Sequence, residues 1–391
     1  MHNFDVIIVG AGLVGRLCAI GLAKRGLAVA SIDHEASDTL INAARDGRTT
    51  AMTLGSKRLF DSYGLWDAIA PHAQPIQHIR VFEGDSPWAL DYDAQDISND
   101  PMGYIVENTM IREALYESTP ENLTVFAPAS IQSINRTNAN VTVHLNSGET
   151  LNAPLIIAAD GRHSKLRTHT SITVKTNDYD QHALVAHILH EKPHNDTAFE
   201  IFQKDGPLAV LPLLPDAKTG QHKSGLVWCK PRAFDWAAYD DQSLAGMFEK
   251  LFPYYGSITF LPKRWIYPLS YTKVSAMIDN RMALIGDAAH VVHPIAGQGV
   301  NLGWRDAAIL IDELATAKSQ GIDLGCPFLL KSYDKQRKFD RLSVLWATDG
   351  ISHLYHSQLP PVRFARNAAF AVLNHIKPFK RAVMRRAMGI S

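Results

Sequence analysis

The stretch FDVIIVGAGLVGRLCAIGLAKRGLAVASID, residues 4–33, decides the fold class of this chain. Residues 6–9 are apolar and predict a short buried strand, residues 13–24 have helical spacing, and residues 27–32 predict a second strand. A strand, a glycine-rich turn, a helix and another strand in this order are typical of a parallel sheet with flanking helices. The sequence therefore predicts an α/β fold that begins with a Rossmann-like unit.

Three glycines, Gly10, Gly12 and Gly15, form the pattern GxGxxG between the first strand and the helix. The first glycine permits a tight turn, the second lets a pyrophosphate approach the backbone, and the third lets the helix pack closely on the strand. The helix start offers N–H groups and partial positive charge to phosphates. Asp33 ends the second strand, where a carboxylate binds ribose hydroxyls and disfavours a 2′-phosphate. These residues predict a site for FAD or NAD rather than NADP.

The composition excludes several classes of function. The chain has 391 residues, of which 46% are hydrophobic, and it has 39 basic and 39 acidic residues, so no charge excess points to nucleic acid. Cys18, Cys229 and Cys326 lack CxxC spacing, so we expect neither a disulfide framework nor a metal site. No apolar run approaches ~20 residues, and Asp5 and Gly10 interrupt the apolar start, so we expect a cytoplasmic protein without a signal peptide.

Two later strand ends carry an acidic residue beside a glycine. LNAPLIIAADGRHSKLR, residues 151–167, predicts a buried strand followed by Asp160, and RMALIGDAAH, residues 281–290, predicts another followed by Gly286 and Asp287. Ligands of parallel sheets bind at the carboxyl ends of the strands. We therefore expect these residues to meet the GxGxxG turn at one edge of a single sheet.

The segment GDAAHVVHPIAGQGVNLGWRD, residues 286–306, completes a set of three motifs. GxGxxG, ADGxxSxxR and GDAAHxxxPxxGQGxNLGxxDA together resemble the FAD-dependent aromatic hydroxylases related to p-hydroxybenzoate hydroxylase. The chain is most similar to the subgroup of ubiquinone-biosynthesis hydroxylases, and the resemblance covers essentially the whole chain. The stretches that resemble the subgroup are DGRTTAM (46–52), YGLWDAI (63–69), GYIVENTMIREAL (103–115), GPLAVLPLLP (206–215) and LPPVRFARN (359–367).

The resemblance implies roles for individual residues. Asp287 would bind the ribityl or pyrophosphate part of FAD, Pro294 would border the flavin on the substrate side, and the backbone around Gln298 would approach the pyrimidine edge of the ring. Asn301 and Leu302 would begin the following helix. The residues implied to bind the cofactor are Gly10, Gly12, Gly15, Asp33, Arg48, Arg112, Asp160, Gly286, Asp287, Gly299, Val300 and Asn301, and those implied to position flavin and substrate for catalysis are Pro294, Gly297 and Gln298. The subgroup often has Gln where this chain has Arg112.

The resemblance also implies the reaction. NAD(P)H or another reductant would reduce FAD, O2 would add at flavin C4a, and the hydroperoxide would transfer one oxygen to the ring of a polyprenylated phenol or quinol in ubiquinone biosynthesis. No GxSxG, HExxH or paired-cysteine pattern is present, which fits chemistry carried by a cofactor. His290 and His293 have no third ligand nearby in sequence, so we expect structural or loop-positioning roles and no metal.

The pattern also predicts the order of domains. We expect a Rossmann-like FAD-binding domain with an inserted β-sheet substrate domain and a helical C-terminus. The predicted parts are 1–75, 101–175 and 270–325 for the FAD-binding domain, 76–100 for a short β insertion, 176–269 for the substrate domain and 326–391 for the C-terminal region.

The C-terminal residues 362–391 contain seven arginines and lysines (Arg363, Arg366, Lys377, Lys380, Arg381, Arg385 and Arg386) and no acidic residue. A helix starting near Pro378 would place Phe379, Val383 and Ala387 on one face and basic residues roughly opposite. Such a helix suits an anionic lipid surface or a partner, as well as a solvated helix packed on the core. The polyprenyl tails of the family's substrates favour contact with the inner membrane face or assembly into a ubiquinone-biosynthesis complex.

Two other functions stay open at this level. The chain can be a flavin hydroxylase of a small soluble aromatic, or a flavin-binding assembly or lipid-carrier protein without turnover. A flavin halogenase is disfavoured because the WxWxIP motif of that branch is missing.

Overall fold

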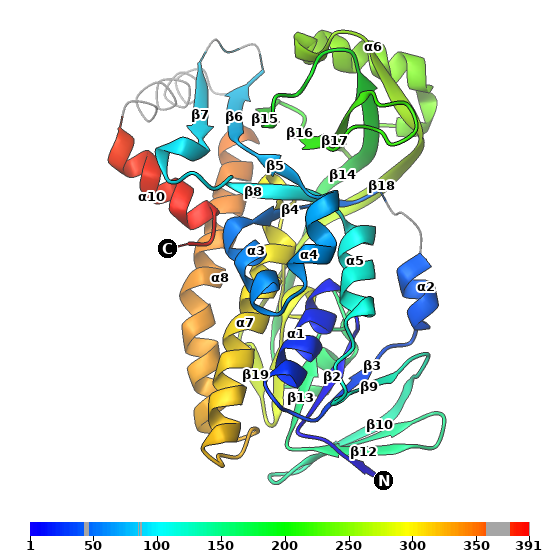
Figure 1. Ribbon diagram of the computed structural model, residues 1–391, viewed down its shortest axis with the longest axis vertical. Helices are drawn as coiled ribbons and strands as arrows, with labels where there is room; N and C mark the ends of the chain where they lie inside the picture. Colours follow the sequence, from blue (N-terminus) through cyan, green and yellow to red (C-terminus); the bar gives the residue numbers. More distant parts are fainter. Residues whose placement is uncertain (43–46, 85, 87, 357–375, 391) are drawn as a thin grey trace.

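A computed structural model describes residues 1–42, 47–84, 86, 88–356 and 376–390 (Figure 1). The subgroup-like stretch 359–367 and the basic residues Arg363 and Arg366 lie outside the described residues. Figure 1 shows the N-terminus at the end formed by β10 and β12, and α6 at the opposite end.

A six-stranded sheet forms the centre of the described chain and is parallel except for its edge strand β19. The first unit is confirmed: a strand at Val6–Val9, helix α1 at Leu13–Lys24, and a second strand that starts at residue 29 rather than 27. In spatial order the strands are β19 (Ile278–Asp279), β20 (Met282–Leu284), β13 (Leu155–Ala158), β2 (Val6–Val9), β3 (Val29–Ile32) and β9 (Leu123–Phe126).

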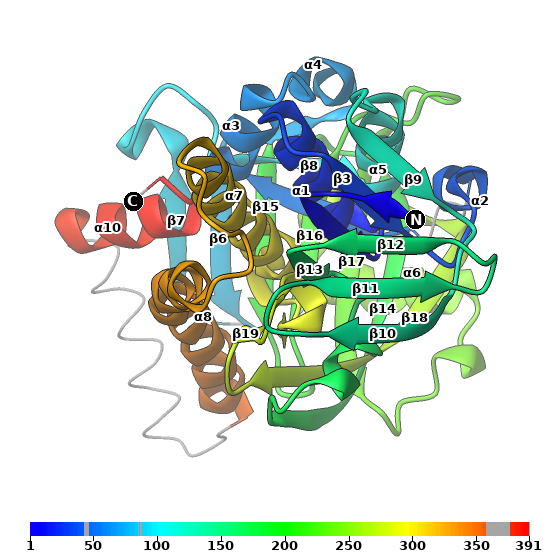
Figure 2. The same ribbon diagram turned by 90° about the horizontal axis from the view of Figure 1, so that it is seen from below.

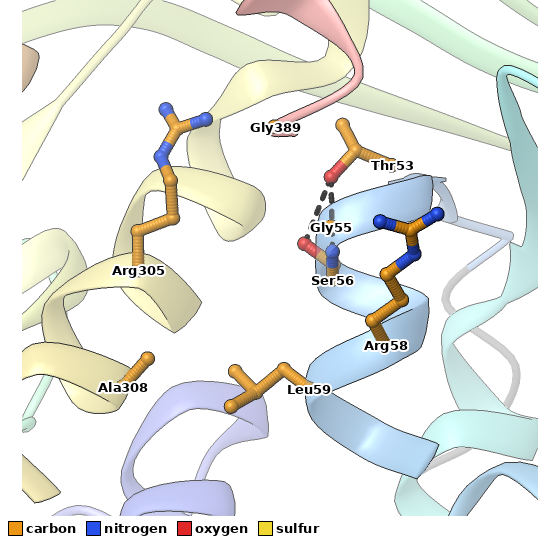
Figure 3. Close-up of a pocket in the computed structure, with 8 residues that line it drawn as sticks. All are labelled: Thr53, Gly55, Ser56, Arg58, Leu59, Arg305, Ala308 and Gly389. Carbon is orange, nitrogen blue, oxygen red and sulfur yellow. Dashed lines mark hydrogen bonds between the residues drawn. The ribbon is translucent and has the colours of Figure 1, made fainter. Parts of the chain in front are cut away.

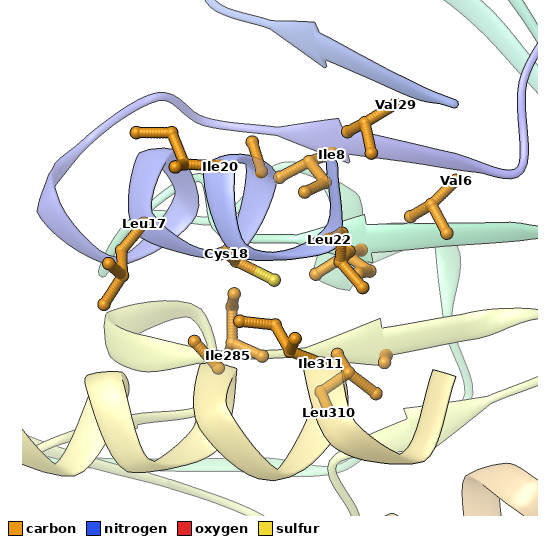
Figure 4. Packing of buried hydrophobic residues seen from close by; sticks show 14 of the residues in the cluster. Val6, Ile8, Leu17, Cys18, Ile20, Leu22, Val29, Ile285, Leu310 and Ile311 are labelled. Atoms are coloured by element: carbon orange, nitrogen blue, oxygen red, sulfur yellow. The ribbon is translucent and has the colours of Figure 1, made fainter. Parts of the chain in front are cut away.

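The core lies between this sheet, α1 and the long helix α7 (Gln298–Ser319). Figure 4 shows Ile8 of the sheet, Leu17 and Cys18 of α1, and Ile311 of α7 in one apolar cluster. All four are fully buried. Each buried aliphatic side chain contributes about 1.5–3 kcal/mol, so this packing fixes the sheet against the helix that starts beside the later flavin motif.

A second sheet of eight strands lies beside the first (Figures 1 and 2). Its strands β14 and β18 are each 17 residues long and run through the positions where the sequence placed domain boundaries, at 175/176 and 269/270. The spatial order is β21 (His290–Val291), β18 (Ile258–Val274), β14 (Val174–His190), β17 (His222–Pro231), β16 (Leu208–Leu213), β15 (Thr197–Phe202), β6 (His78–Glu83) and β7 (Ala89–Asp93).

Successive side chains of a strand point to opposite faces, and β14 uses this alternation to separate two environments. Leu184, Ala186 and Ile188 belong to the apolar cluster that also contains Phe248 of α6 (Asp241–Leu251). His187 lies between them on the opposite face, where its Nε2 is 3.1 Å from the carbonyl oxygen of Gly47, just before strand β4 (Thr49–Thr53). The eight-stranded sheet therefore presents one face to the cofactor motifs.

Two smaller sheets and the remaining helices complete the described fold. One sheet has the order β1 (His2–Asn3), β12 (Thr150–Ala153), β11 (Val141–Leu145) and β10 (Ile131–Arg136), and the other has β4 (Thr49–Thr53), β8 (Gly103–Glu107) and β5 (Gln74–Ile76). The remaining helices are α2 (Ser37–Asn42), α3 (Leu54–Ser62), α4 (Trp66–Ile69), α5 (Asn108–Glu117), α8 (Pro327–His356) and α10 (Lys377–Ala387), with 3-10 turns at Ala70–His72, Ala94–Asp96, Leu166–His169, Trp236–Ala238, Pro253–Tyr255, Gly286–Ala288 and Ile295–Gly297.

The C-terminal helix α10 packs through a face that the sequence did not single out. Met384 and Met388 are buried in a cluster with Leu54 of α3, and Lys380 forms an ion pair of 3.0 Å with Asp96. Phe379 is 51% exposed, so the stripe predicted to be apolar faces away from the core. Within the described part of the chain, no helix is both long enough and apolar enough to cross a membrane.

Candidate functional site

The parallel strands bring four distant segments to one edge of the central sheet. β2 pairs in parallel with β3 and with β13, and β13 pairs in parallel with β20, so all four strands end on the same side. Gly10 follows β2, Asp33 follows β3, Asp160 lies just beyond β13 and Gly286 lies just beyond β20. Residues separated by up to 276 positions of sequence thus share one site.

The three glycines of the GxGxxG turn have different reasons to be glycine. Gly10 has φ +101°, and a Cβ there would lie 2.3 Å from the carbonyl oxygen of Ala159. A Cβ on Gly15 would lie 2.0 Å from the carbonyl oxygen of Gly10. Gly12 has φ −67°, and a Cβ there would meet no heavy atom within 4 Å. The protein itself therefore tolerates a side chain at Gly12, and open space at the start of α1 suits the close approach of a pyrophosphate.

Asp33 holds the glycine-rich turn. Its Oδ2 accepts a hydrogen bond of 2.6 Å from the backbone N–H of Ala11, and Oδ1 accepts one of 3.0 Å from that of Glu35. Tyr116 of α5 donates from its hydroxyl to the carbonyl oxygen of Ala11 at 2.9 Å, and burial raises the pKa of this phenol to about 12. The sequence analysis missed Tyr116, although it lies one helical turn after Arg112 on the same face.

The two predicted arginines take different positions. Arg112 is half-buried on α5 and is an electrostatic neighbour of Tyr116, so it lies beside the glycine-rich turn. Arg48 is exposed, and its guanidinium carbon lies 5.6 Å from the centre of the Tyr267 ring on β18. The structure thus places Arg48, just before β4, against strand β18 of the eight-stranded sheet.

The two other acidic residues of this edge have oxygens available for a ligand. Oδ2 of Asp160 accepts a hydrogen bond from the backbone N–H of Leu166 at 3.0 Å, whereas Oδ1 is buried without a hydrogen-bond partner among the described residues. Asp287 is exposed in the turn that follows β20. Carboxylate oxygens in these positions are suited to accept hydrogen bonds from the hydroxyl groups of a nucleotide cofactor.

A buried charge network supports the turn at Gly286. Asp306 of α7 accepts hydrogen bonds from the N–H of Gly286 at 3.0 Å, from Nε2 of His290 at 2.6 Å and from Nε of Arg337 at 2.7 Å. Burial opposes ionisation of Asp306, but His290 and Arg337 outweigh it and lower the pKa to about 2. Asp306 belongs to the third sequence motif, which implied no role for it, and in the structure it joins α8 to the turn at Gly286.

His293 connects the loop before α7 to the eight-stranded sheet. It is fully buried, its Nε2 lies 3.3 Å from Oε1 of Gln181, and its ring contacts Tyr179 of the same strand at 4.8 Å. No group of three or more His, Cys, Asp and Glu side chains in the described parts of the chain could hold a metal ion. The contacts of His290 and His293 are those of residues that hold a loop in place.

Helix α7 begins at Gln298, three residues before the predicted start at Asn301. Gly297 precedes it with φ +59°, a backbone conformation that favours glycine. The N–H groups of Gly299 and Val300 lie in the first turn, where a helix offers donors and partial positive charge. They face the partly exposed segment that begins at Pro294.

Asn301 fixes this segment from inside. Its Nδ2 donates to the carbonyl oxygens of Ala51 at 2.7 Å and Gly297 at 3.0 Å, and its Oδ1 accepts from the N–H of Thr53 at 3.0 Å and from Oγ of Ser56 at 2.7 Å. The side chain of Asn301 therefore binds protein groups and holds the loop against β4.

Trp304 of α7 packs inside the core. Its Nε1 donates to the carbonyl oxygen of Leu13 at 3.1 Å, and its ring contacts Phe60 edge-on at 4.8 Å. It is fully buried.

Strands β16 and β17 form a partly exposed apolar wall on the face that approaches β4. Gly225 of β17 approaches Thr49 of β4, and Gly225 pairs with Leu211 of β16. Two residues further along, on the same face of the sheet, Val227 pairs with Ala209. Leu211, Val227 and Ala209 are only half-buried. Half-buried apolar side chains beside a polar loop suit the binding of an apolar ligand.

The residues at this edge fit a bound FAD. Gly12 leaves room for the pyrophosphate, Asp33 holds the glycine-rich turn at the end of β3, Asp160 has a buried oxygen without a hydrogen-bond partner among the described residues, and the start of α7 offers N–H groups.

Comparison with known proteins agrees with this geometry. The chain is 38% identical over 390 residues to a ubiquinone hydroxylase of Rhodospirillum rubrum, covering 98% of this chain and 89% of that protein. It is 31% identical to the 3-demethoxyubiquinol 3-hydroxylase of Escherichia coli, covering 99% of this chain and 98% of that protein. The crystal structure of p-nitrophenol 4-monooxygenase from Pseudomonas putida has the same fold, with a TM-score of 0.82, 20% identity and 99% coverage of both chains.

By its fold and its site, the chain is an FAD-dependent monooxygenase of the aromatic hydroxylase class. It belongs to the family defined by the FAD binding domain, whose model matches residues 3–341. The expected α/β fold and the expected cofactor, FAD, are confirmed.

Proposed function

We propose that this protein hydroxylates the aromatic ring of a polyprenylated phenol or quinol in ubiquinone biosynthesis. The observation that carries the proposal is the half-buried apolar wall of Leu211 and Val227 on the sheet face that approaches β4. Leu211 shares an apolar cluster with Ala51 of β4, and Ala51 lies beside Gly297 of the loop that leads into α7. An apolar wall next to the flavin motif suits a substrate with a long hydrocarbon tail. The names of the two bacterial relatives, a ubiquinone hydroxylase and a 3-demethoxyubiquinol 3-hydroxylase, support the same substrate class.

Bound FAD supplies the electron transfer and the activation of O2, and the protein supplies binding, orientation and exclusion of water. Gly10, Gly12, Gly15, Asp33, Asp160 and Asp287 would hold the nucleotide and ribityl parts, with Arg48 and Arg112 beside them. The start of α7 at Gln298, Gly299 and Val300 would stabilise negative charge at the pyrimidine edge of the ring. Pro294 and Gly297 would set the distance between ring and substrate.

The electron donor in this proposal is NAD(P)H. Steady-state oxidation of NADH and of NADPH, each measured with a prenylated phenol present, distinguishes the two nucleotides and detects the case in which neither is used.

The proposal also includes contact with the inner face of the cytoplasmic membrane. On α10, Phe379 is 51% exposed and Val383 is 37% exposed, while Arg381 and Arg385 are exposed at positions roughly opposite them. An exposed apolar stripe on a basic helix is the combination that binds anionic lipid surfaces. A membrane position would give the enzyme access to a substrate whose tail is dissolved in lipid, and membership of a biosynthetic complex is an alternative way to the same access.

Mass spectrometry of the quinone pool in the native host, with the gene deleted, tests the proposed pathway. Accumulation of a prenylated intermediate that lacks one ring oxygen is the expected result, and its structure names the carbon. An unchanged pool in a host without a second hydroxylase of this class would reject the pathway. Turnover of a short phenol by the purified enzyme would then favour the small-aromatic alternative, and FAD binding without O2 consumption would favour an assembly or lipid-carrier role.

A further inference from the structure

A cavity of about 350 Å³ lies away from the strand-end site, between α3, α7 and the segment that follows α10 (Figure 3). Volumes of this size hold small ligands. Figure 3 shows Arg305 and Arg58 on opposite walls, with Ala308 and Leu59 together at one end. The lining residues are Thr53, Gly55, Ser56, Arg58, Leu59, Arg305, Ala308 and Gly389.

The C-terminal segment closes this cavity through a close backbone contact. The N–H of Gly55 donates to the carbonyl oxygen of Met388 at 2.8 Å, and a Cβ on Gly55 would lie 2.2 Å from the carbonyl oxygen of Gly389. Met388 is buried in the same region. These contacts fix the position of Gly389, so the cavity has defined walls on three sides.

Arg305 enters the cavity wall with spare hydrogen-bonding capacity. Its Nε lies 2.9 Å from Oδ2 of Asp340, but its Nη2 is buried and has no hydrogen-bond partner among residues that the structure describes. Burial lowers the pKa of Arg305 although Asp340 opposes this shift, which indicates that the positive charge is incompletely compensated. Because Arg305 forms part of the cavity wall, an anion placed in the cavity would lie close to this incompletely compensated positive charge.

Arg58 on the facing wall is also available. Its side chain is 57% exposed, and its contact with Asp100 is a 3.4 Å pair between two exposed groups, which holds the guanidinium only weakly. The hydroxyl groups of Thr53 and Ser56 are already engaged, since Thr53 Oγ1 and Ser56 Oγ bond to each other at 3.0 Å and Ser56 Oγ bonds to Asn301. The groups left to recognise a ligand are therefore two guanidinium groups and an apolar end.

We propose that this cavity binds a phosphate group between Arg58 and Arg305, and that the apolar part of a phosphate ester lies against Leu59 and Ala308. Guanidinium groups bind phosphate oxygens in pairs, and a tetrahedral anion can engage two arginines from opposite sides. The phosphate has two possible sources, the headgroup of an anionic lipid and a free phosphate ion or ester. Nothing in this assignment depends on the hydroxylation reaction.

Occupancy of the cavity connects to the flavin loop through Asn301. This side chain accepts from Thr53 N–H and Ser56 Oγ in the cavity wall and donates to the carbonyl oxygen of Gly297. A ligand that shifts the start of α3 therefore shifts the loop, and the visible absorption of bound flavin offers a second readout.

Isothermal titration calorimetry of the purified, FAD-loaded protein tests the proposal. The probes are dihexanoyl phosphatidate below its micelle concentration, dihexanoyl phosphatidylcholine with the same chains, and inorganic phosphate. We expect saturable one-to-one binding of the phosphatidate, weakened about tenfold or more in Arg58→Gln and in Arg305→Gln. The phosphatidylcholine is expected not to bind, since its phosphate is masked by a cation.

The control and the remaining outcomes separate the sources. Arg25→Gln is the control. It removes an exposed arginine that pairs with Asp312, a residue on the same helix as Arg305, and it is expected to leave binding unchanged. Ala308→Leu fills the cavity without altering a charge and is expected to abolish binding, which keeps the test decisive if Arg305→Gln fails to fold. Binding of inorganic phosphate as tight as that of the phosphatidate assigns a free phosphate. Equal binding of both lipids, no saturable binding, or binding unaffected by Arg58→Gln and Ala308→Leu overturns the proposal, and leaves the hydroxylase assignment untouched.

Discussion

Nε2 of His293 lies 3.3 Å from Oε1 of Gln181, so the loop before α7 is hydrogen bonded to a strand of the eight-stranded sheet. The two residues are 112 positions apart in sequence. This contact sets the distance between the flavin loop and the sheet that carries the apolar wall. It is therefore the place where a small change should separate cofactor binding from productive oxygen transfer.

The His293→Ala variant is expected to bind FAD with unchanged affinity and to lose coupling between O2 consumption and product formation. Removal of the imidazole frees the loop, so substrate and flavin are no longer held at a fixed distance. Oxygen-electrode measurements combined with product quantification give the ratio, and hydrogen peroxide should account for the difference. His72→Ala, which changes an exposed histidine, is the matched control. Full coupling in His293→Ala would show that the contact has no positioning role.

Gly12→Ala separates the needs of the protein from those of the cofactor. A Cβ at Gly12 meets no protein atom within 4 Å, so the apoprotein should be unchanged in stability or stabilised by about 0.5 kcal/mol. FAD affinity, measured by fluorescence quenching, should fall about tenfold or more because the methyl group occupies the pyrophosphate side of the turn. Gly15→Ala is the contrast, since its Cβ would lie 2.0 Å from the carbonyl oxygen of Gly10 and the apoprotein itself should be destabilised. Tight FAD binding by Gly12→Ala would contradict the site.

Asp306→Asn should destabilise the apoprotein by about 3–5 kcal/mol, because Arg337 would remain buried without its main carboxylate partner. Urea denaturation followed by circular dichroism measures this difference. Asp312→Asn on the same helix removes an acid that is 65% exposed and paired with Arg25, and it should cost less than about 1 kcal/mol. If the two variants lose similar amounts of unfolding free energy, the buried network of Asp306 contributes little to stability.

Stability should fall in mildly acidic solution because of His190. Burial lowers the pKa of this residue from 6.5 to about 4, while the unfolded chain keeps the ordinary value. The unfolded state therefore binds more protons between these values, and the free energy of unfolding decreases as pH falls from about 6.5 toward 4. Urea denaturation at pH 7 and pH 5 gives the slope, which should flatten in His190→Gln. The exposed His34→Gln should keep the slope of the parent protein.

Replacing both Phe379 and Val383 by Ser should weaken binding to vesicles that contain phosphatidylglycerol, because the exposed apolar stripe of α10 is lost. Cosedimentation at low and high salt measures the effect, and salt should weaken the parent protein as well, since Arg381 and Arg385 contribute by charge. Phe328→Ser removes a phenylalanine that is 82% exposed on α8 and serves as control. Equal sedimentation of all three proteins would reject α10 as the membrane contact.

The sequence predicted those elements whose bounds depend on residues within a single segment. Helix α1 spans the predicted residues 13–24 because glycines and apolar spacing define both of its ends. The start of α7 was placed three residues too late, since Gly299 has low helix propensity and tertiary packing overrides it. The contacts of Asn301 with β4 and of His293 with Gln181 join segments more than 100 positions apart, so no pattern within one segment reveals them. The buried face of α10 depends on which neighbour covers it, here α3 at Leu54.

The order of strands in the central sheet has a consequence for how the protein is made. β2, β13 and β20 lie side by side, yet they come from residues 6–9, 155–158 and 282–284. A ribosome must therefore release nearly three quarters of the chain before the cofactor edge has its last strand. Parallel pairing across such separations is slow to form, and FAD stabilises only the state in which the edge is complete. Supply of flavin during expression should accordingly raise the yield of folded protein by trapping molecules late in folding.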